Sequence, residues 1–476
     1  MTPLINSGTG GGCSVLTMRV LRQGVTSGKK EKMINRFINW LYEQVDNSGI
    51  VLWRIMLGFL LTAEAWGAIM TGWMTETFVE PEFRFTFIGF EFLQVLSGEV
   101  MYAYNVIMGV LGLMVMVGWR YRIGAIGYFL MWAGIYFGQK SHYNNHYYLL
   151  LLLVGMMIFV PANAYASLDA KRNPEIKSLS VPRWAYFILM LQFAVVYFYA
   201  TVAKLYPDWL QAKPVSLWLT AKSDFWLIGP LLEQDITHWL FAYGGIFYDA
   251  TIIPFLIFRK TRKLALVLSC VFHLTNSAVF QIGIFPFMAI SAIVIFWDPD
   301  KLRNLFFKRK PEFVPVHRNL TLTRIQKIMI ILFTVYFLWQ IYLPLRHHFY
   351  DGNVHWTEEG HRLSWQMMTR SKYSTGYFVV EDITTNERFT VRAEDRLLPH
   401  QTSGLFARPD MIWQYARYLK EEYRDQGRDS VAVYAKTNVS LNGRPMQPIV
   451  DPDFDLAGVE KWKRFESKPW ITELKD

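Results

Sequence analysis

LQFAVVYFYATVAKLYPDW, residues 191–209, is an apolar and aromatic stretch typical of a membrane-spanning helix. Lys204 is its only basic residue and stands just before a Pro-Asp-Trp stop. An ammonium group at the edge of the hydrocarbon is costly unless it snorkels to the interface, pairs with an anion or loses its proton. The stretch therefore predicts a helical membrane protein in which Lys204 either anchors a helix end or belongs to a functional site.

Long apolar runs dominate the chain up to about residue 345. The 476 residues are 52% hydrophobic and 16% aromatic, and about nine segments are long enough to span a bilayer. These segments lie near residues 50–70, 101–118, 123–138, 147–162, 183–203, 238–258, 264–280, 282–298 and 325–344. We expect a polytopic α-helical membrane protein with about nine transmembrane helices and a C-terminal extramembrane α+β domain that is mainly β.

The pattern divides the chain into three regions. Residues 1–34 are Gly-rich and then basic, lack the apolar core of a signal peptide and predict a disordered leader. Residues 35–345 form the predicted membrane domain, and residues 346–476 the predicted extramembrane domain. In this last region, two stretches predict β-hairpins: YFVVEDITTNERFTVRAED, which turns at Thr-Thr-Asn, and residues 430–450, which turn at Asn442-Gly443. The stretch between them, DMIWQYARYLKEEYRDQ, predicts a helix.

The net charge of +10 does not predict a nucleic-acid partner, because the basic residues fall in short clusters between apolar segments. Every second gap between these segments is rich in Lys and Arg, whereas the intervening gaps are poor in them. The positive-inside rule then predicts a cytoplasmic N-terminus and, after nine crossings, a C-terminal domain on the outer face of the membrane. The two cysteines, Cys13 and Cys270, predict neither a disulfide framework nor a thiolate metal site.

This topology brings three polar clusters to one membrane depth, near the outer face. They are Lys204, the loop KSHYNNHYYLL at residues 140–150, and FHLTNSAVF at residues 272–280. In the loop, His142 and His146 are four residues apart, as a metal or haem pair would be, but no nearby carboxylate or thiolate supplies a third ligand, and we expect no metal. A capping loop and a set of hydrogen-bonding catalytic groups remain as alternatives.

Other polar residues lie inside the apolar segments. His273 and Asn276 share a helix face, either as a hydrogen-bonded link between helices or as part of a site. Arg54, near the predicted cytoplasmic end of its segment, is interpreted as a snorkelling anchor. Glu64 and Asp249 need partners or water, and we favour structural pairing for them.

Four stretches carry a resemblance to a known family: VVYFYATVAKLYPDW, NNHYYL, FHLTNSAVFQIGIF and WTEEGHRLSWQMM at residues 356–368. Together they make the chain resemble the vitamin K-dependent γ-glutamyl carboxylase family, in a bacterial form, over roughly residues 35–400. The resemblance implies that Lys204 is the catalytic base and that Asn145 and His146 are active-site residues. It also implies that reduced vitamin K, O2 and CO2 are the cofactor and co-substrates, and that the membrane is a bacterial inner membrane. Further candidates for binding the quinone or the substrate are His273, Asn276, Tyr197 and Trp356.

Such enzymes couple oxygenation of the quinol to removal of a glutamate γ-proton and addition of CO2. The first proton transfer needs a neutral amine, and desolvation favours the uncharged form of lysine. We therefore expect an integral-membrane carboxylase and epoxidase that acts on a glutamate-containing peptide or protein, with a lipid-soluble quinone as its membrane partner. The alternatives are a quinone- or lipid-binding protein without carboxylation, and a metal or haem electron carrier that uses His142 and His146.

Overall fold

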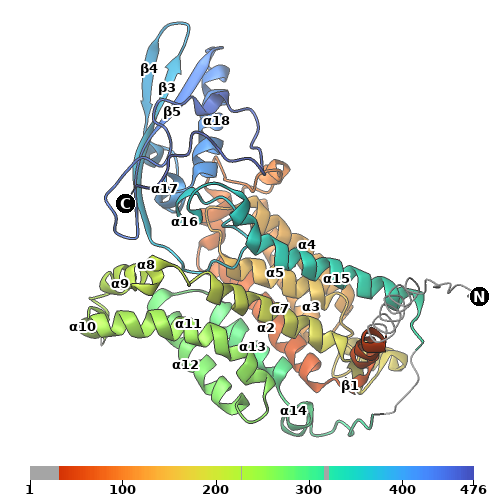
Figure 1. The fold of residues 1–476 in the computed structure, drawn as a ribbon. Helices are drawn as coiled ribbons and strands as arrows, with labels where there is room; N and C mark the ends of the chain where they lie inside the picture. The colour runs from red at the N-terminus through yellow and green to blue at the C-terminus, as the bar shows by residue number, and fades with distance from the viewer. Residues whose placement is uncertain (1–31, 227, 316–320, 476) are drawn as a thin grey trace, which may run out of the picture.

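The chain folds into a helical bundle with a C-terminal α+β domain at one end (Figure 1). The computed structural model describes residues 32–226, 228–315 and 321–475. Residues 1–31 of the expected leader lie outside the described residues, whereas residues 32–42 are helical.

Nine helices make up the body of the bundle in the described part of the chain. They are α2 (Ser48–Met70), α3 (Val100–Val117), α4 (Tyr121–Gly138), α5 (Asn145–Met157), α7 (Trp184–Val202), α11 (Asp235–Ile257), α12 (Arg262–Phe280), α13 (Phe285–Phe296) and α15 (Arg324–Leu345). Within the described residues, six of them, α2, α3, α7, α11, α12 and α15, are long and apolar enough to cross a membrane.

The prediction of nine transmembrane helices is therefore not confirmed. The three remaining segments fold as α4, α5 and α13, of which α5 has 13 residues and α13 has 12. Helix α5 begins only at Asn145, where the Asn144 side chain caps it, and α13 stops before Trp297-Asp298-Pro299. Helix α4 has 18 residues but carries four glycines and three tyrosines, which lower its hydropathy.

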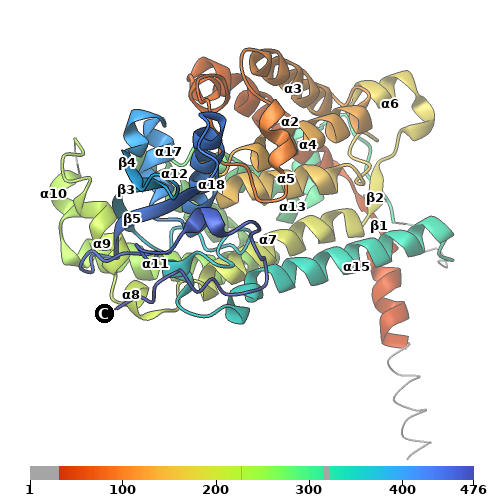
Figure 2. The same ribbon diagram turned by 90° about the horizontal axis from the view of Figure 1, so that it is seen from above.

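The end of the bundle away from the C-terminal domain is closed by a two-stranded antiparallel sheet, β1 (Gln44–Asp46) with β2 (Ser180–Pro182). The short helices α6 (Leu168–Arg172) and α14 (Pro299–Phe306) also lie at this end. On the domain side, α7 is followed by α8 (Pro207–Leu210), α9 (Lys213–Thr220) and α10 (Gly229–Leu232), which pack beside α11 (Figure 1). Figure 2 shows α15 running along α7, where the Tyr199 hydroxyl donates to the Ile341 carbonyl at 2.8 Å.

The C-terminal domain contains one three-stranded antiparallel sheet in the order β4-β3-β5. Its elements are α16 (Val354–Thr357), β3 (Lys372–Asp382), β4 (Glu387–Val391), α17 (Pro399–Leu405), α18 (Pro409–Asp425) and β5 (Val431–Leu441). The hairpin around Thr-Thr-Asn and the helix after it are thus confirmed. The second predicted hairpin, around Asn442-Gly443, forms only a single β-bridge between Val439 and Gln447. The domain is therefore α+β, but the expectation that it is mainly β was wrong.

Buried ion pairs fix the C-terminal domain to the bundle. Asp410, at the start of α18, binds the Lys140 ammonium from the loop before α5 and the Arg362 guanidinium at 2.6 Å. Asp208 of α8 accepts from the Asn442 amide at 2.8 Å and from Arg444 at 3.0 Å. The contacts Lys140–Asp410 and Asp208–Asn442 each join residues more than 200 positions apart, and they hold the domain over the start of α5 and the end of α7.

Candidate active site

Lys204 follows the end of α7 and turns into the bundle. Its Nζ lies 2.7 Å from Oδ2 of Asp249 on α11 and donates to the Ala200 carbonyl at 3.2 Å. The Lys204 and Asp249 side chains are only 8% and 6% exposed, and Nζ is 5.4 Å from the Trp209 ring centroid. A snorkelling anchor would have its amine in solvent, so the geometry favours the functional interpretation of Lys204.

A cavity of about 470 Å³ opens beside this ion pair. It lies among α7, α9, α11, α12 and the start of α13, and aromatic side chains make up much of its wall. The predicted residues Tyr197, Lys204, His273, Asn276 and His146 all line it. The convergence of three polar clusters, expected from the topology, is therefore present as one cavity.

His273 connects α12 to two other helices of the cavity. Its Nε2 lies 3.2 Å from the Tyr197 hydroxyl and 3.0 Å from the Tyr248 hydroxyl, and Tyr248 also donates to Ser269 at 3.0 Å. His273 Nδ1 is buried and has no hydrogen-bond partner among the described residues. His273 is thus both a link between helices and a cavity residue with one nitrogen unused.

Asn145 and His146 form the first turn of α5. The Asn145 amide accepts from the Tyr143 hydroxyl at 2.9 Å and donates to the Gln366 carbonyl at 3.3 Å, which ties this turn to the segment that leads into the C-terminal domain. The His146 ring stacks on Phe285 with centroids 4.0 Å apart. Asn145 therefore holds the start of α5 in place, whereas His146 faces the cavity.

A second, polar cavity of about 430 Å³ lies on the other side of His146. Asn145, Glu358, Arg362, Arg370 and Arg408 are among its lining residues. The two cavities share part of their lining, namely His146, Ile282, Phe285, Met367 and Met368. An apolar chamber with a lysine and a charged chamber with arginines thus meet at one wall.

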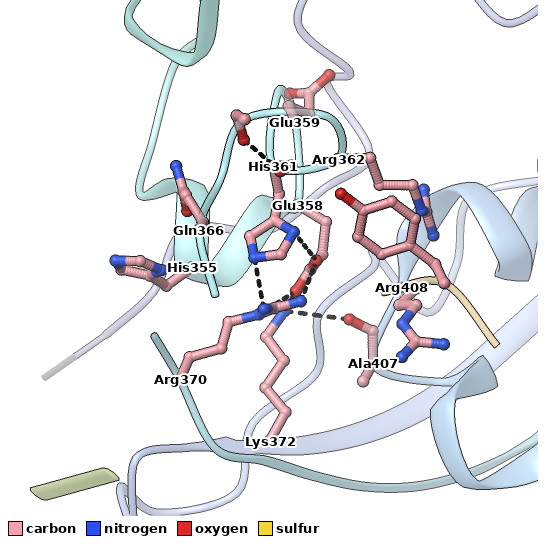
Figure 3. A network of polar contacts seen from close by, with 12 residues as sticks. His355, Glu358, Glu359, His361, Arg362, Gln366, Arg370, Lys372, Ala407 and Arg408 are labelled. Carbon is pink, nitrogen blue, oxygen red and sulfur yellow. Dashed lines mark hydrogen bonds and ion pairs between the residues drawn. The ribbon is translucent and has the colours of Figure 1, made fainter. Parts of the chain in front are cut away.

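Most of the charge in the second cavity is already paired (Figure 3). Glu358 accepts from Arg370 Nε at 2.7 Å and from Lys372 Nζ at 2.7 Å, and Arg370 contacts His361 Nε2 at 2.6 Å. Burial alone would raise the pKa of Glu358, but Arg370 and Lys372 hold that pKa well below its usual range. Burial lowers the pKa of Lys372 to about 8 against the opposing effect of Glu358, so the pair stays ionised at neutral pH.

Arg408 differs from these side chains. Its guanidinium makes only a 3.5 Å contact with the Ser141 carbonyl and a 3.6 Å contact with the Met411 sulfur, and it forms no ion pair with any described residue. Burial lowers the pKa of Arg408 to about 10, with Arg362 as a further cause, so the group remains a cation at neutral pH. A desolvated guanidinium without a carboxylate is a ready site for an anion.

Two predicted residues lie elsewhere. Trp356 is fully buried in the core of the C-terminal domain, where its indole donates to the Thr472 carbonyl at 2.7 Å, and the structure does not bring it to Lys204. The His142 ring stacks on His400 at 4.4 Å and not beside His146. Among the described residues, no group of three or more His, Cys, Asp and Glu side chains could hold a metal ion.

The three charged residues singled out inside the apolar segments, Arg54, Glu64 and Asp249, find partners. Arg54 is not a snorkelling anchor, because it is fully buried and donates to the Ala162 and Ala166 carbonyls at 3.1 and 2.6 Å. Glu64 lies beside the Tyr147 hydroxyl. Asp249 pairs with Lys204, as the expected structural pairing of this acid requires, although the sequence did not identify Lys204 as its partner.

The fold and the two cavities define a polytopic helical membrane protein that contains a ligand-sized apolar chamber beneath an extramembrane domain. Residues 42–301 match the family model of the HTTM domain, which places the chain among the proteins that share this membrane domain. Residues 325–476 match the model described as vitamin K-dependent gamma-carboxylase, lumenal domain. The chain therefore belongs to the vitamin K-dependent gamma-carboxylase family, which confirms the resemblance read from the sequence. A search of solved structures found no match.

Proposed function

We propose that the protein is a quinol-dependent γ-glutamyl carboxylase and epoxidase of the membrane. The observation that carries this proposal is the arrangement of the two cavities. Lys204 lies in an apolar chamber, and Arg408, which has no carboxylate partner among the described residues, lies in a charged chamber. His146 stands in the wall that both chambers share. A reaction that couples a lipid-soluble ring to a charged amino acid needs two such compartments side by side.

The apolar chamber fits a quinol. Its volume of about 470 Å³ falls within the ~300–1,000 Å³ range of small-molecule sites, and its walls offer aromatic faces for a flat ring. Tyr197, His273 and Asn276 provide the few polar groups that would orient the ring hydroxyls. Reduced vitamin K, when bound, would supply through its reaction with O2 the strong base that the glutamate γ-proton requires.

Lys204 and Asp249 act together as the base in this proposal. An ammonium cannot accept a proton, but transfer of its proton to the carboxylate 2.7 Å away gives a neutral amine and a neutral acid with no change in total charge. The amine then accepts the hydroxyl proton of the quinol, so that the pair as a whole gains one proton. Because the total charge of the pair does not change in this transfer, the transfer suits a chamber of low dielectric.

His146 and the methionines Met367 and Met368 belong to the wall that the two chambers share. His146 can donate to developing negative charge, while Met367 and Met368 are flexible apolar side chains that exclude water. Asn145 fixes the orientation of the turn that carries His146 through its bonds to Tyr143 and Gln366.

Arg408 recognises the side-chain carboxylate of the substrate glutamate. It is the guanidinium of the charged chamber that lacks a carboxylate partner among the described residues, whereas Arg362 pairs with Asp410 and Arg370 with Glu358. A glutamate bound to Arg408 would lie in the chamber that His146 also lines. Addition of CO2 at its γ-carbon gives the second carboxylate of the product.

The orientation in the membrane is part of the proposal: the N-terminus faces the cytoplasm and the C-terminal domain faces outward. Single cysteines in a cysteine-free background at the exposed positions Lys222 and Lys463, near or in the domain, should react with an impermeant thiol reagent in intact cells. Cysteines at Lys177 and Lys260 should react only after lysis. Labelling of both pairs in intact cells, or the reverse order, would contradict this orientation.

The decisive experiment supplies the purified full chain with reduced vitamin K, O2, labelled bicarbonate and a glutamate peptide, and measures epoxide and incorporated label separately. We expect both products, and neither from Lys204→Ala, since both depend on the deprotonated quinol. A small exogenous amine should partly restore epoxide formation in Lys204→Ala. Saturable binding of the quinone without epoxide or label would support the alternative of a binding protein, and wild-type epoxide formation in the variant would exclude Lys204 as the base.

A further inference from the structure

A basic cleft lies at the opposite end of the bundle from the candidate active site. It has a volume of about 710 Å³ and is formed between the turn that carries α6 and the end of α14. Lys171, Lys177, Lys308, Arg309 and Lys310 line it, and no Asp or Glu is among the described residues of its lining. We call these five residues and the space between them the basic cleft.

The floor of the basic cleft is part of the rigid bundle. Lys310 is buried and donates to Asp46 Oδ1 at 2.7 Å and to Ser48 Oγ at 2.8 Å, which fixes it to the start of α2. On the facing wall, Arg54 of α2 binds three carbonyls of the turn at residues 162–166. Both walls are therefore anchored to the same helix, so the separation of the walls is fixed by that helix and not by surface loops.

The other four cations of the basic cleft are not neutralised. Lys171, Lys177, Lys308 and Arg309 are exposed, and none of their side chains forms an ion pair or a hydrogen bond with another residue in the described part of the chain. Lysines at this end of the helices satisfy the positive-inside rule without binding anything. That rule, however, does not require the cations to surround a cavity, whereas these four cations all line the same cavity.

Apolar side chains border the cations on the α14 side. Leu305 is 65% exposed and Phe306 is 55% exposed, and both line the basic cleft. A soluble anion would gain nothing from these two side chains, whereas a molecule with a charged head and a hydrocarbon tail would bury them. This combination of charge and exposed apolar surface discriminates between a free phosphate and a lipid.

We propose that the basic cleft binds an anionic phospholipid, with the headgroup phosphate between Lys171, Lys177, Lys308 and Arg309 and the acyl chains against Leu305 and Phe306. Basic pockets between helix ends on the cytoplasmic side are suited to such headgroups. Each basic side chain near an anionic lipid strengthens binding by roughly five-fold. The site is independent of quinol or glutamate chemistry.

The test places the full chain in phosphatidylcholine nanodiscs with a trace of photoactivatable phosphatidylglycerol and maps the cross-linked peptides. We expect labelling of residues 299–310 and 165–177, and competition by unlabelled phosphatidylglycerol. Lys308→Gln/Arg309→Gln should require roughly 25-fold more competitor, since two charges of about five-fold each are lost. The matched control Arg259→Gln/Lys260→Gln removes two exposed cations that lie outside the lining of the cleft and should leave competition unchanged.

Several outcomes would overturn the proposal. If the control variant also needs about 25-fold more competitor, the effect comes from general surface charge and not from the cleft. If a photoactivatable phosphatidylcholine labels the same peptides equally well, the anionic headgroup is not recognised. Competition by glycerol 3-phosphate or inorganic phosphate as strong as that of the lipid would identify a free-phosphate site instead. If Lys308→Gln/Arg309→Gln does not fold, Lys171→Gln/Lys177→Gln tests the opposite wall, and unchanged competition there would also refute the proposal.

Discussion

The ion pair between Lys204 and Asp249 makes a prediction about stability that does not depend on any assay of activity. Its atoms are 2.7 Å apart and its side chains are 8% and 6% exposed. Removing one partner of a buried pair leaves an uncompensated charge and costs roughly 3–5 kcal/mol. Lys204→Met and Asp249→Asn should each destabilise the protein by about this amount, whereas the double variant should lose about 3 kcal/mol less than the sum of the two single losses.

A double-mutant cycle measures the coupling between the two residues. The wild-type chain, the two single variants and the double variant are unfolded in mixed micelles with increasing fractions of a denaturing detergent, and tryptophan fluorescence gives the free energy of unfolding. We expect a coupling of about 3 kcal/mol, the upper end of what contacting residues show. The exposed pair Arg424–Glu421, at 3.0 Å with side chains 50% and 55% exposed, is the matched control and should give about 0.5 kcal/mol.

Activity of the same variants tests the proposed chemistry. If the pair is the base, Asp249→Asn should lower epoxide formation by roughly 100-fold or more, the typical contribution of a general base. A coupling no larger than that of the control pair would refute the buried ion pair. A strong coupling with wild-type epoxide formation in Asp249→Asn would leave the ion pair in place but refute its part in proton transfer.

Three further predictions concern the surroundings of the site. His146→Ala should abolish activity while His142→Ala should have little effect, because only His146 lines the cavities; equal losses together with loss of a bound metal would favour the electron-carrier alternative. Arg408→Gln should raise the KM for the glutamate peptide at least ten-fold without changing quinol binding, whereas Arg424→Gln should change neither; an unchanged KM would contradict carboxylate recognition. Burial would raise the pKa of Asp410, but Arg362 and Lys140 lower it to about 2 from an ordinary 3.8. The ionised Asp410 therefore contributes fully to the free energy of unfolding above pH 3.8, and this contribution is lost as pH falls through 2. The shift corresponds to about 2 kcal/mol. Unfolding measured between pH 5 and 2 should therefore show an acid loss of stability that Asp410→Asn lacks, and identical slopes in the two proteins would exclude this assignment.

Local sequence determined the elements of this protein. Runs of apolar residues must be helical where no water can satisfy the backbone, so the long helices α2, α3, α7, α11, α12 and α15 were recognisable from composition and length. The β3–β4 hairpin follows from alternation around Thr-Thr-Asn, which depends on neighbouring residues alone. The unusual position of Lys204 was also visible, because a single cation in an apolar segment is a local anomaly.

Tertiary structure decided which side chains meet. The partner of Lys204 is 45 positions away on α11, and the choice of Asp249 depends on how two helices are rotated against each other. The sequences around Trp356 and Arg408 both mix aromatic and charged residues. Nevertheless, Trp356 is fully buried in the core of the C-terminal domain, whereas Arg408 lines the cavity that His146 also lines. Periodicity determines which residues share a helix face, but the packing of faces from distant segments sets burial, pairing and the shape of the two chambers.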